Sequence, residues 1–389
     1  MMSISKTNGQ PKKIRVLHIV GGMDRAGAET WLYNVRKCLS KELIQMDFVV
    51  HGNKTYDYEE ELTMMGCEFI RCTHAGNPVY YTASLFRALK KRPKYDIIHA
   101  HIHYYSGFAL VASRLAGIRA LVCHSHIDKL ASMGKPSLMQ KTYQSIMRTL
   151  INKLSLAKVA VSQNAGADLF GAKWKPIAND HIIPCGIDIT KYKINLDAAT
   201  TKKQLKLPEE SVVIGHVGRL ERQKNHTFLL KAFHNARSLN PKLHLLCIGQ
   251  GSLIDQLKLE ADRLGISENV TFTGAANNVT TIMQEAMDGF VFPSLFEGIP
   301  LALVEAQAAG LYTIMSDSIP SQAEVYPGST VRLSLSEPVE IWARHISQID
   351  GSEKTGRQMK ALKAIKERGM DVTSTAEKIL AIYINLITY

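Results

Sequence analysis

Short apolar runs alternate with longer amphipathic segments along the whole chain. The apolar runs have the length of buried strands, and the amphipathic segments repeat their apolar residues at helical spacing. In the first half we expect strands at 14–20, 46–51, 67–72, 96–101, 120–124 and 157–162, and helices at 31–39, 58–65, 81–91, 107–116 and 137–154. Repeated strand–helix units of this length predict a parallel, doubly wound sheet whose loops gather at the carboxyl ends of the strands.

The same pattern restarts near residue 212 and continues toward the end of the chain. There we expect strands at 212–217, 243–248, 270–273, 289–292 and 312–316, with helices between them and from 338 onward. A chain of 389 residues is too long for one ordinary core. We therefore predict an α/β protein with domains at 1–187 and 188–370, followed by an apolar terminal helix within 371–389.

The segment 137–154 allows two interpretations. Its apolar residues form one helical stripe: Met139, Tyr143, Ile146, Met147 and Leu150. Such a stripe could meet lipid as part of a surface helix, yet it more often packs into a core. The stripe by itself therefore favours the interpretation that this helix packs into the core.

Positive charge is concentrated in the first half of the chain. The net charge is +12, and residues 1–188 carry 25 Lys and Arg against 14 Asp and Glu, while the remainder carries 22 against 21. A basic run from Lys90 to Lys94 ends one predicted helix. Because no nucleic-acid-binding motif accompanies this charge, we expect no nucleic-acid partner and favour an anionic membrane surface or a phosphate-bearing lipid.

The chain lacks the sequence signals of membrane insertion. No apolar run reaches the ~20 residues of a membrane span, and residues 1–13 lack the apolar centre of a signal peptide. We therefore expect a cytoplasmic protein that meets a membrane, if at all, peripherally. The six cysteines lack metal-ligand spacing and are expected to be buried thiols.

Two carboxylates flank a predicted helix start in the stretch 289–310. Glu297 lies in a loop with Pro and Gly, and Glu305 lies about one and a half turns inside the following Ala-rich helix. Backbone N–H groups at Gly298 and Ile299 would point into the same space. A carboxylate in an apolar helix needs a partner, which either a sugar hydroxyl or an ordinary salt bridge could supply.

Arg219 and Lys224 follow the predicted strand 212–217 and precede a helix that starts near Asn225. Two cations at a helix N-terminus suit a diphosphate, although a basic loop is usually only solvated.

Two glycine pairs also follow predicted strands: Gly21 with Gly22, and Gly249 with Gly251. They could let the backbone approach phosphate or could merely shape turns. The second pair lacks the third glycine and the acidic residue of a dinucleotide motif, which argues against a nicotinamide enzyme.

Histidines gather at two successive strand ends, with His99, His101 and His103 after one strand and His124 and His126 after the next. A metal site would require the first strand to extend past residue 101, and no acidic third ligand is evident, so we expect no metal. Hydrogen bonding or proton handling suits these positions better, although the side chains could simply fix the loops.

Together these motifs resemble the retaining glycosyltransferases of family 4. The run from Pro293 to Pro300, which reads Pro-Ser-Leu-Phe-Glu-Gly-Ile-Pro, is followed by a second glutamate eight positions after the first and is similar to the donor-site signature. Gly218-Arg219-Leu220 with Lys224 resembles the phosphate clamp of the family, and the run from His181 to Asp188 resembles its interdomain link. Ala302 and Cys185 depart from the pattern, because a polar or bulky residue and Asn are frequent there.

The resemblance implies a GT-B fold, in which two Rossmann-like domains face a cleft and the terminal helix crosses back to the first. It implies transfer of a hexose from a UDP- or GDP-sugar to a hydroxyl, with retention of anomeric configuration and with neither a metal nor another cofactor. The expected acceptor is an oligosaccharide or a lipid-linked glycan of polysaccharide assembly at an anionic membrane surface.

The resemblance also implies roles for the site residues. Arg219 and Lys224 would stabilise the departing diphosphate, Glu305 would bind the ribose, and Glu297 would hold the sugar. His124 would bond the sugar or the acceptor, with His101 and His126 on the acceptor side. The implied donor-binding set is Gly21, Gly22, Arg219, Lys224, Gly249, Gly251, Glu297, Gly298, Ile299, Pro300, Leu301 and Glu305.

Two other functions fit the same fold. A nucleotide-sugar epimerase should carry further acid/base carboxylates, which the sequence does not reveal. A non-catalytic nucleotide-sugar-binding protein is disfavoured by the presence of Arg219, Lys224, Glu297 and Glu305.

Overall fold

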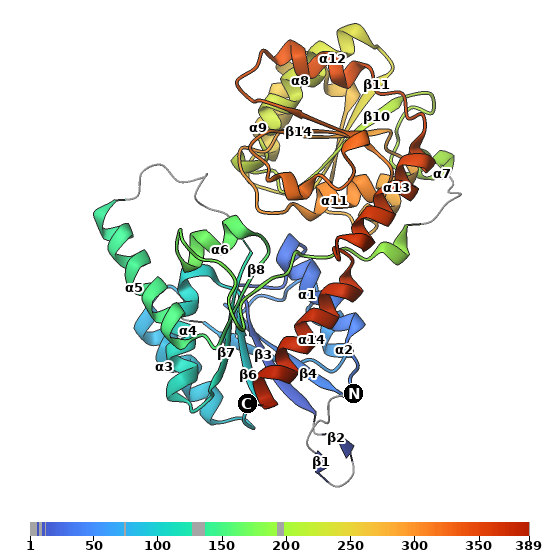
Figure 1. Ribbon diagram of the computed structural model, residues 1–389. Helices are drawn as coiled ribbons and strands as arrows, with labels where there is room; N and C mark the ends of the chain where they lie inside the picture. The colour runs from blue at the N-terminus through green and yellow to red at the C-terminus, as the bar shows by residue number, and fades with distance from the viewer. Residues whose placement is uncertain are drawn as a thin grey trace. The chain divides into compact units, whose positions relative to one another are not determined.

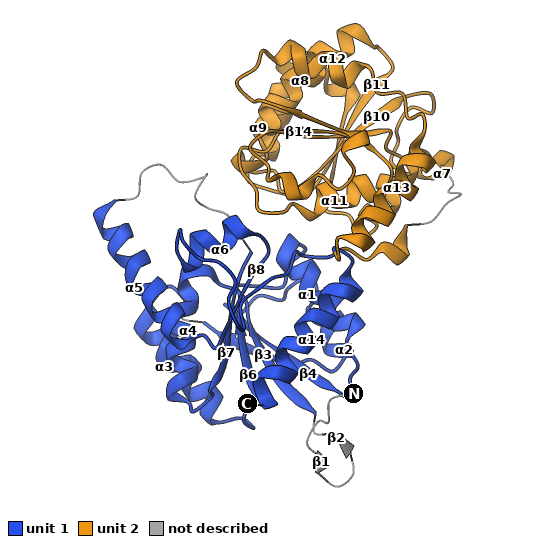
Figure 2. Cartoon of the chain, viewed as in Figure 1, with its two compact units in different colours: residues 1–186, 370–389 blue, residues 187–369 orange. Residues whose placement is uncertain are grey.

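The chain folds into two compact units (Figure 1). Unit 1 comprises Met1–Gly186 and Met370–Tyr389, and unit 2 comprises Ile187–Gly369, as coloured in Figure 2. The structure, a computed structural model, describes the side chains of residues 13–73, 75–126, 137–192 and 198–388. Each unit is an α/β sandwich built on one parallel sheet.

Seven parallel strands form the sheet of unit 1, in the order β5–β4–β3–β6–β7–β8–β9. They are β3 (Ile14–Ile19), β4 (Ile44–His51), β5 (Phe69–Cys72), β6 (Ile97–Ala100), β7 (Ala120–Ser125), β8 (Ala157–Ala160) and β9 (His181–Ile182). In this register Val16 lies opposite Met46 on one side and Ile97 on the other. The central strands β6 and β7 are buried along their whole length, which explains their continuous apolar runs.

Helices cover both faces of this sheet. They are α1 (Gly27–Cys38), α2 (Glu59–Met64), α3 (Pro78–Lys90), α4 (Ser106–Leu115), α5 (Leu138–Leu154), α6 (Gln163–Phe170) and α14 (Val372–Thr388). In Figure 1, α3, α4 and α5 lie side by side on one face, and α1, α2 and α14 lie on the other. The terminal helix α14 packs on α1, where the Trp31 indole N–H donates to Thr375 Oγ1 at 3.2 Å.

Unit 2 repeats the same architecture with six parallel strands in the order β12–β11–β10–β13–β14–β15. The strands are β10 (Val212–Val217), β11 (Leu243–Ile248), β12 (Val270–Gly274), β13 (Gly289–Phe292), β14 (Tyr312–Ser316) and β15 (Thr330–Leu333). The helices are α7 (Ala198–Gln204), α8 (His226–Leu239), α9 (Ile254–Arg263), α10 (Val279–Glu285), α11 (Leu301–Ala308), α12 (Val339–Ser347) and α13 (Lys354–Glu367). Helices α8 and α12 pack against each other over a core that includes Phe233 and Trp342.

Both sheets therefore have the Rossmann strand order, in which the first and fourth strands of the unit are neighbours. These strands are β3 and β6 in unit 1, and β10 and β13 in unit 2. Ligands of such sheets bind beyond the carboxyl ends of the strands at this switch point. The fold confirms the predicted pair of Rossmann-like α/β domains.

The structure corrects the interpretation of the stripe on α5. Met147 and Ile151 are buried, and a side chain at Gly107 of α4 would contact Met147 Sδ at only 2.8 Å, so α4 and α5 approach closely there. The remaining large apolar side chains of the first turns are exposed: Leu138, Met139, Tyr143 and Ile146. Because only one side of α5 meets α4, part of the stripe is left on the surface.

The cysteines also differ in part from expectation. Five are buried free thiols, whereas Cys38 is exposed. Cys38 is the last residue of α1, where the helix leaves the sheet, so its side chain is not covered.

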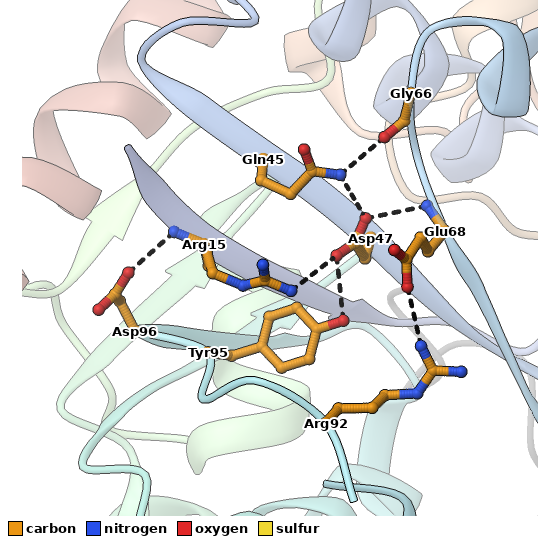
Figure 3. Close-up of polar contacts among 8 residues, drawn as sticks. All are labelled: Arg15, Gln45, Asp47, Gly66, Glu68, Arg92, Tyr95 and Asp96. Carbon is orange, nitrogen blue, oxygen red and sulfur yellow. Dashed lines mark hydrogen bonds and ion pairs between the residues drawn. The ribbon is translucent and has the colours of Figure 1, made fainter. Parts of the chain in front are cut away.

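A buried carboxylate joins three strands of unit 1 (Figure 3). Asp47 of β4 is fully buried and accepts hydrogen bonds from Gln45 Nε2 at 2.7 Å, the Glu68 backbone N–H at 2.9 Å and the Tyr95 hydroxyl at 3.0 Å. The Arg15 guanidinium lies 3.8 Å from Asp47 Oδ2, the oxygen that also accepts from Tyr95. Glu68 precedes β5 and Tyr95 precedes β6, so this network stabilises the amino ends of these strands. The loops that are predicted to carry the site lie at the opposite, carboxyl ends.

We expect Asp47→Asn to lower the free energy of unfolding by about 2 kcal/mol, because an amide cannot accept all of these hydrogen bonds as a carboxylate does. Urea unfolding measures the change. Glu68→Gln is the matched control, since it loses only the surface pair with Arg92 and should change stability by less than about 0.5 kcal/mol. Equal stability of the two variants would contradict a structural role for Asp47.

Candidate functional site

The predicted donor-site residues of unit 2 lie at its switch point. Arg219 follows β10, and the run from Pro293 to Pro300 follows β13, the neighbouring strand. The two loops are joined by backbone and side-chain hydrogen bonds: the Leu295 N–H donates to Gln223 O, and Gln223 Nε2 donates to Phe296 O, both at 2.9 Å. Residues that lie 73 positions apart in sequence, such as Gln223 and Phe296, therefore form one surface.

Lys224 and Glu297 form an ion pair in this surface. Lys224 Nζ donates to Glu297 Oε1 at 2.6 Å, and the side chains are only 14% and 9% exposed. The ammonium also lies over the Phe292 ring, 4.6 Å from its centroid. The sequence predicted both residues for the donor site but not their pairing or the role of Phe292.

Arg219 differs from Lys224 in having an exposed side chain, and its guanidinium makes no hydrogen bond or ion pair with the residues that the structure describes. It is therefore a cation at the switch point whose hydrogen-bond donors are free to bind an anion.

Gly249 and Gly251 allow two loops to touch. Gly249 has φ of 144°, and a Cβ there would lie 2.0 Å from Gly218 O, while a Cβ on Gly251 would lie 2.3 Å from Leu220 O. These glycines press the loop after β11 against the loop that carries Arg219. Gly249 and Gly251 therefore help to shape the loop that is predicted to bind phosphate.

Glu305 is placed by helix α11. Pro300 is the N-cap of this helix and Leu301 its first residue, so Glu305 is the fifth helical residue. Its side chain is half-buried, and this burial raises the pKa of Glu305 to about 7, an effect that Lys191 opposes. A carboxyl so placed is held partly protonated near neutral pH.

The backbone before α11 also offers free hydrogen-bond donors. The N–H groups of Gly298 and Ile299 find no acceptor among the described residues. They lie in the same loop as Glu297, as the sequence predicted, and could donate to hydroxyl or phosphate oxygens.

In unit 1 the two predicted glycines follow β3. A Cβ at Gly22 would lie 2.4 Å from the Tyr56 ring, so this glycine is required for packing. Gly21 has open space at its Cβ position. Only Gly21 therefore has room beside it for a ligand.

The structure brings four of the five predicted histidines together at the β6 and β7 ends and adds His18 of β3. His101 Nε2 lies 3.0 Å from His18 Nδ1, and His101 Nδ1 lies 2.8 Å from His126 Nε2. His103 is separate, because β6 ends at Ala100 and His103, at φ of 52°, turns toward Asp168 Oδ2 at 3.0 Å. His18 was not among the residues predicted from the sequence. Its position as a polar residue inside the apolar run Val16–Ile19 was the signal that could have indicated it.

His124 is fully buried, and neither of its ring nitrogens has a hydrogen-bond partner among the described side chains and backbone. Its ring stacks on His126 at 4.0 Å between centroids and on His99 at 5.3 Å, and meets the Trp31 ring edge-to-face at 5.3 Å. Burial lowers the pKa of His124 well below the usual value, with the neighbouring histidines adding to the effect, so the ring is neutral.

Two histidine triads have ligand atoms within 4.8 Å of one another, His18 with His99 and His101, and His101 with His124 and His126. The sequence had favoured hydrogen bonding over metal binding here.

No helix within the described ranges has both the length and the apolar character needed to span a bilayer.

Comparisons with known proteins agree with this architecture. Residues 25–191 match the model of Glycosyltransferase Family 4, and residues 197–360 match that of Glycosyl transferases group 1. The chain is 33% identical over 374 residues to EpsF of Bacillus subtilis (strain 168), covering 95% of this chain and 96% of the relative. It is 29% identical over 238 residues, 60% of each chain, to the UDP-Gal:alpha-D-GlcNAc-diphosphoundecaprenol alpha-1,3-galactosyltransferase of Escherichia coli.

The fold is also similar to that of Anabaena HepE, solved in complex with UDP and glucose. The TM-score is 0.77 at 20% identity, covering 94% of this chain and 98% of HepE. The two Rossmann-like units and the motif-bearing loops define a glycosyltransferase of GT-B fold. The chain belongs to the family 4 glycosyltransferases.

Proposed function

We propose that this enzyme transfers a hexose from a UDP- or GDP-sugar to a hydroxyl of a lipid-linked glycan, with retention of anomeric configuration. The observation that carries the proposal is the surface at the unit 2 switch point, where Arg219, the Lys224–Glu297 pair and free backbone N–H groups lie on two joined loops. The structure of HepE with UDP and glucose supports a nucleotide-sugar donor for this fold.

In the proposed reaction, negative charge develops on the diphosphate as its bond to the sugar breaks. Arg219 and Lys224 stabilise this charge electrostatically and so perform the function of a divalent metal. Glu297, released in part from Lys224, accepts hydrogen bonds from the sugar hydroxyls, and the Gly298 and Ile299 N–H groups donate to the same ligand. Glu305 binds the ribose hydroxyls.

Retention would follow from attack on the same face from which the diphosphate leaves. No carboxylate is assigned the role of a covalent nucleophile, because Glu297 is ion-paired with Lys224 and Glu305 is assigned to the ribose. A phosphate oxygen of the donor then accepts the proton of the acceptor hydroxyl. His124 bonds the sugar or the acceptor through a ring nitrogen that has no partner within the described structure.

A lipid-linked acceptor is supported by the name of the E. coli relative, which acts on a diphosphoundecaprenol-linked sugar. The excess of basic residues before residue 188 and the exposed apolar side chains of α5 support a peripheral membrane location.

The proposal is tested in two steps. A panel of UDP- and GDP-sugars is screened by thermal shift, where the donor at 100 times its Kd should stabilise the protein by about 2.7 kcal/mol. Transfer to an undecaprenyl-diphosphate-linked sugar is then followed by NMR of the anomeric proton. An altered sugar formed without acceptor would identify an epimerase, and binding without turnover would identify a non-catalytic binding protein.

Activity is expected to persist in excess EDTA, because side-chain cations do the work of a metal at the diphosphate. The measurement is turnover before and after chelation and dialysis. Loss of activity that Mn²⁺ or Zn²⁺ restores would contradict this and would direct attention to the two histidine triads.

Binding to anionic vesicles should fall steeply as salt rises, since each basic residue near the surface contributes about 1 kcal/mol within a Debye length of ~8 Å. Reversal of Lys90, Lys91, Arg92 and Lys94 to Glu should weaken binding in co-sedimentation. Replacement of Leu138, Met139 and Ile146 by Ser should remove a part that salt does not affect.

Reversal of Lys360, Lys363 and Lys366, which are exposed on α13 of unit 2, is the control; it reverses three charges instead of four and should have a much smaller effect. Indifference of the full chain to anionic vesicles at low salt would remove the membrane from the proposal.

A further inference from the structure

A continuous series of hydrogen bonds runs through unit 1 and includes the predicted acceptor-side histidines, His101 and His126. Besides the two contacts of His101, His126 Nδ1 lies 3.6 Å from Cys185 Sγ. At the other end the Tyr383 hydroxyl of α14 lies 3.4 Å from His18 Nε2 and 2.6 Å from His99 Nδ1. The connected groups, called here the histidine chain, are Cys185, His126, His101, His18, Tyr383 and His99.

Every imidazole of the histidine chain is neutral. Burial lowers the pKa of His18 and His126 to about 3, and it lowers the pKa values of His99 and His101 well below their usual value, with neighbouring histidines adding to the shift in three of the four rings. A neutral imidazole has one N–H donor and one acceptor nitrogen.

These rules leave the histidine chain only two arrangements. If one ring reverses its tautomer, two donors or two acceptors face each other at its contact with each neighbouring ring or with the Tyr383 hydroxyl, so the rings must reverse together. Either all four rings carry the proton on Nδ1, or all four carry it on Nε2. Tyr383 couples the tautomers of His18 and His99, since its hydroxyl must accept a hydrogen bond from one ring and donate one to the other.

His101 and His126 have both ring nitrogens engaged in the histidine chain, so neither has a nitrogen left for an acceptor while the chain is intact. His124 has neither nitrogen engaged within the described residues, and its ring stacks on His126 and His99, two members of the chain. The terminal helix supports the same ring a second time, because Thr375 bonds Trp31, which packs edge-on against His124.

We propose that the histidine chain, closed by Tyr383, fixes the rings that hold His124 and leaves His124 as the member of the cluster that bonds a ligand. Tyr383 and His101 are then positioning residues for sugar transfer. The consequence for transfer rests on the proposed function, whereas the shared tautomer does not.

The shared tautomer can be measured by ¹⁵N NMR of histidine-labelled full-length protein, in which protonated and bare ring nitrogens resonate separately. We expect His18, His99, His101 and His126 to show one common tautomer. Mixed tautomers among these four rings in the unaltered protein would overturn the proposal without any variant.

Tyr383→Phe removes the hydroxyl that joins His18 to His99, so the tautomer of His99 should become mixed while His18 keeps the tautomer of His101, to which it stays hydrogen-bonded. Tyr81→Phe is the matched control, because Tyr81 is also buried in unit 1 and its hydroxyl has no partner among the described groups. Spectra of Tyr383→Phe in which His99 keeps a single, unchanged tautomer would overturn the proposal. Stoichiometric Zn²⁺ held by the purified protein on these nitrogens would also overturn it, because the rings would then be ligands.

In transfer assays we expect Tyr383→Phe to lower kcat by about tenfold while the KM for the donor stays within about twofold, because the donor is bound by unit 2 and only ring placement is changed. Tyr81→Phe should leave both constants unchanged. An unaltered kcat in Tyr383→Phe, with tautomers disturbed, would refute the positioning role. A chain with the common tautomer but no transferase activity would instead refute the proposed function.

Discussion

Arg219→Ala is expected to lower turnover in sugar transfer by about 10²-fold or more, which corresponds to about 3 kcal/mol of lost transition-state stabilisation. The guanidinium stands at the unit 2 switch point, exposed and without a hydrogen bond to the described residues. Its removal therefore takes away a cation for the departing diphosphate and breaks no contact that the fold requires. Steady-state kinetics and urea unfolding should show lost turnover with unchanged stability.

Lys224→Ala should cause a similar loss of turnover, but its interpretation differs. The substitution leaves Glu297, whose side chain is only 9% exposed, without its partner at 2.6 Å. Part of the loss can then arise from an unpaired carboxylate in the site. The double variant Lys224→Ala/Glu297→Ala separates these effects in a double-mutant cycle.

Arg222→Ala is the matched control for both substitutions. Arg222 is exposed in the same loop, three residues after Arg219. Its removal changes the net charge equally and should reduce turnover much less. Near-normal turnover of Arg219→Ala, or equal losses for Arg219 and Arg222, would contradict the assignment of the phosphate clamp.

The strands of both sheets could be predicted because buried parallel strands are continuous apolar runs bounded by loops. The elements that were missed lack this signal. Strand β15 lies at the sheet edge with three of its four residues half-buried, and α6 spans only eight residues and includes Gly166. Only Ser162, whose side chain caps α6 by accepting from Ala165 N–H, could have indicated that helix.

The predicted donor-site residues share a surface because they follow neighbouring strands of one parallel sheet, which sequence order alone can indicate. Which side chains pair could not be predicted, since Lys224 and Glu297 lie 73 residues apart. The histidine cluster shows the same limit. Its residues come from β3, from the ends of β6 and β7, and from the distant helix α14, and Tyr383 lies 284 residues from His99.

Glu305→Gln is expected to weaken donor binding by about 10- to 10²-fold at pH 8 and by much less at pH 6. A carboxylate accepts the ribose hydroxyls through charge-assisted hydrogen bonds, which are stronger than those of a neutral group. Because burial raises the pKa of Glu305 to about 7, the free enzyme holds this group mainly protonated at pH 6 and mainly ionised at pH 8. Donor affinity of the unaltered enzyme should therefore rise across this interval, and that of Glu305→Gln should not.

The same raised pKa predicts that the free energy of unfolding falls as pH rises, whereas donor affinity increases. Between pH 4.5, the ordinary pKa of the group, and about 7, the folded chain holds the Glu305 proton while the unfolded chain releases it. The stabilisation from this group is complete below the lower value and is lost as pH rises through the upper one. Unfolding followed from pH 5 to 8 should show this decline in the unaltered enzyme and in Glu340→Gln, an exposed control on α12, but not in Glu305→Gln. If the pH profiles of donor affinity were the same for the unaltered enzyme and Glu305→Gln, this result would contradict the assignment of Glu305 to the ribose. It would do so even if the stability profiles differ as expected.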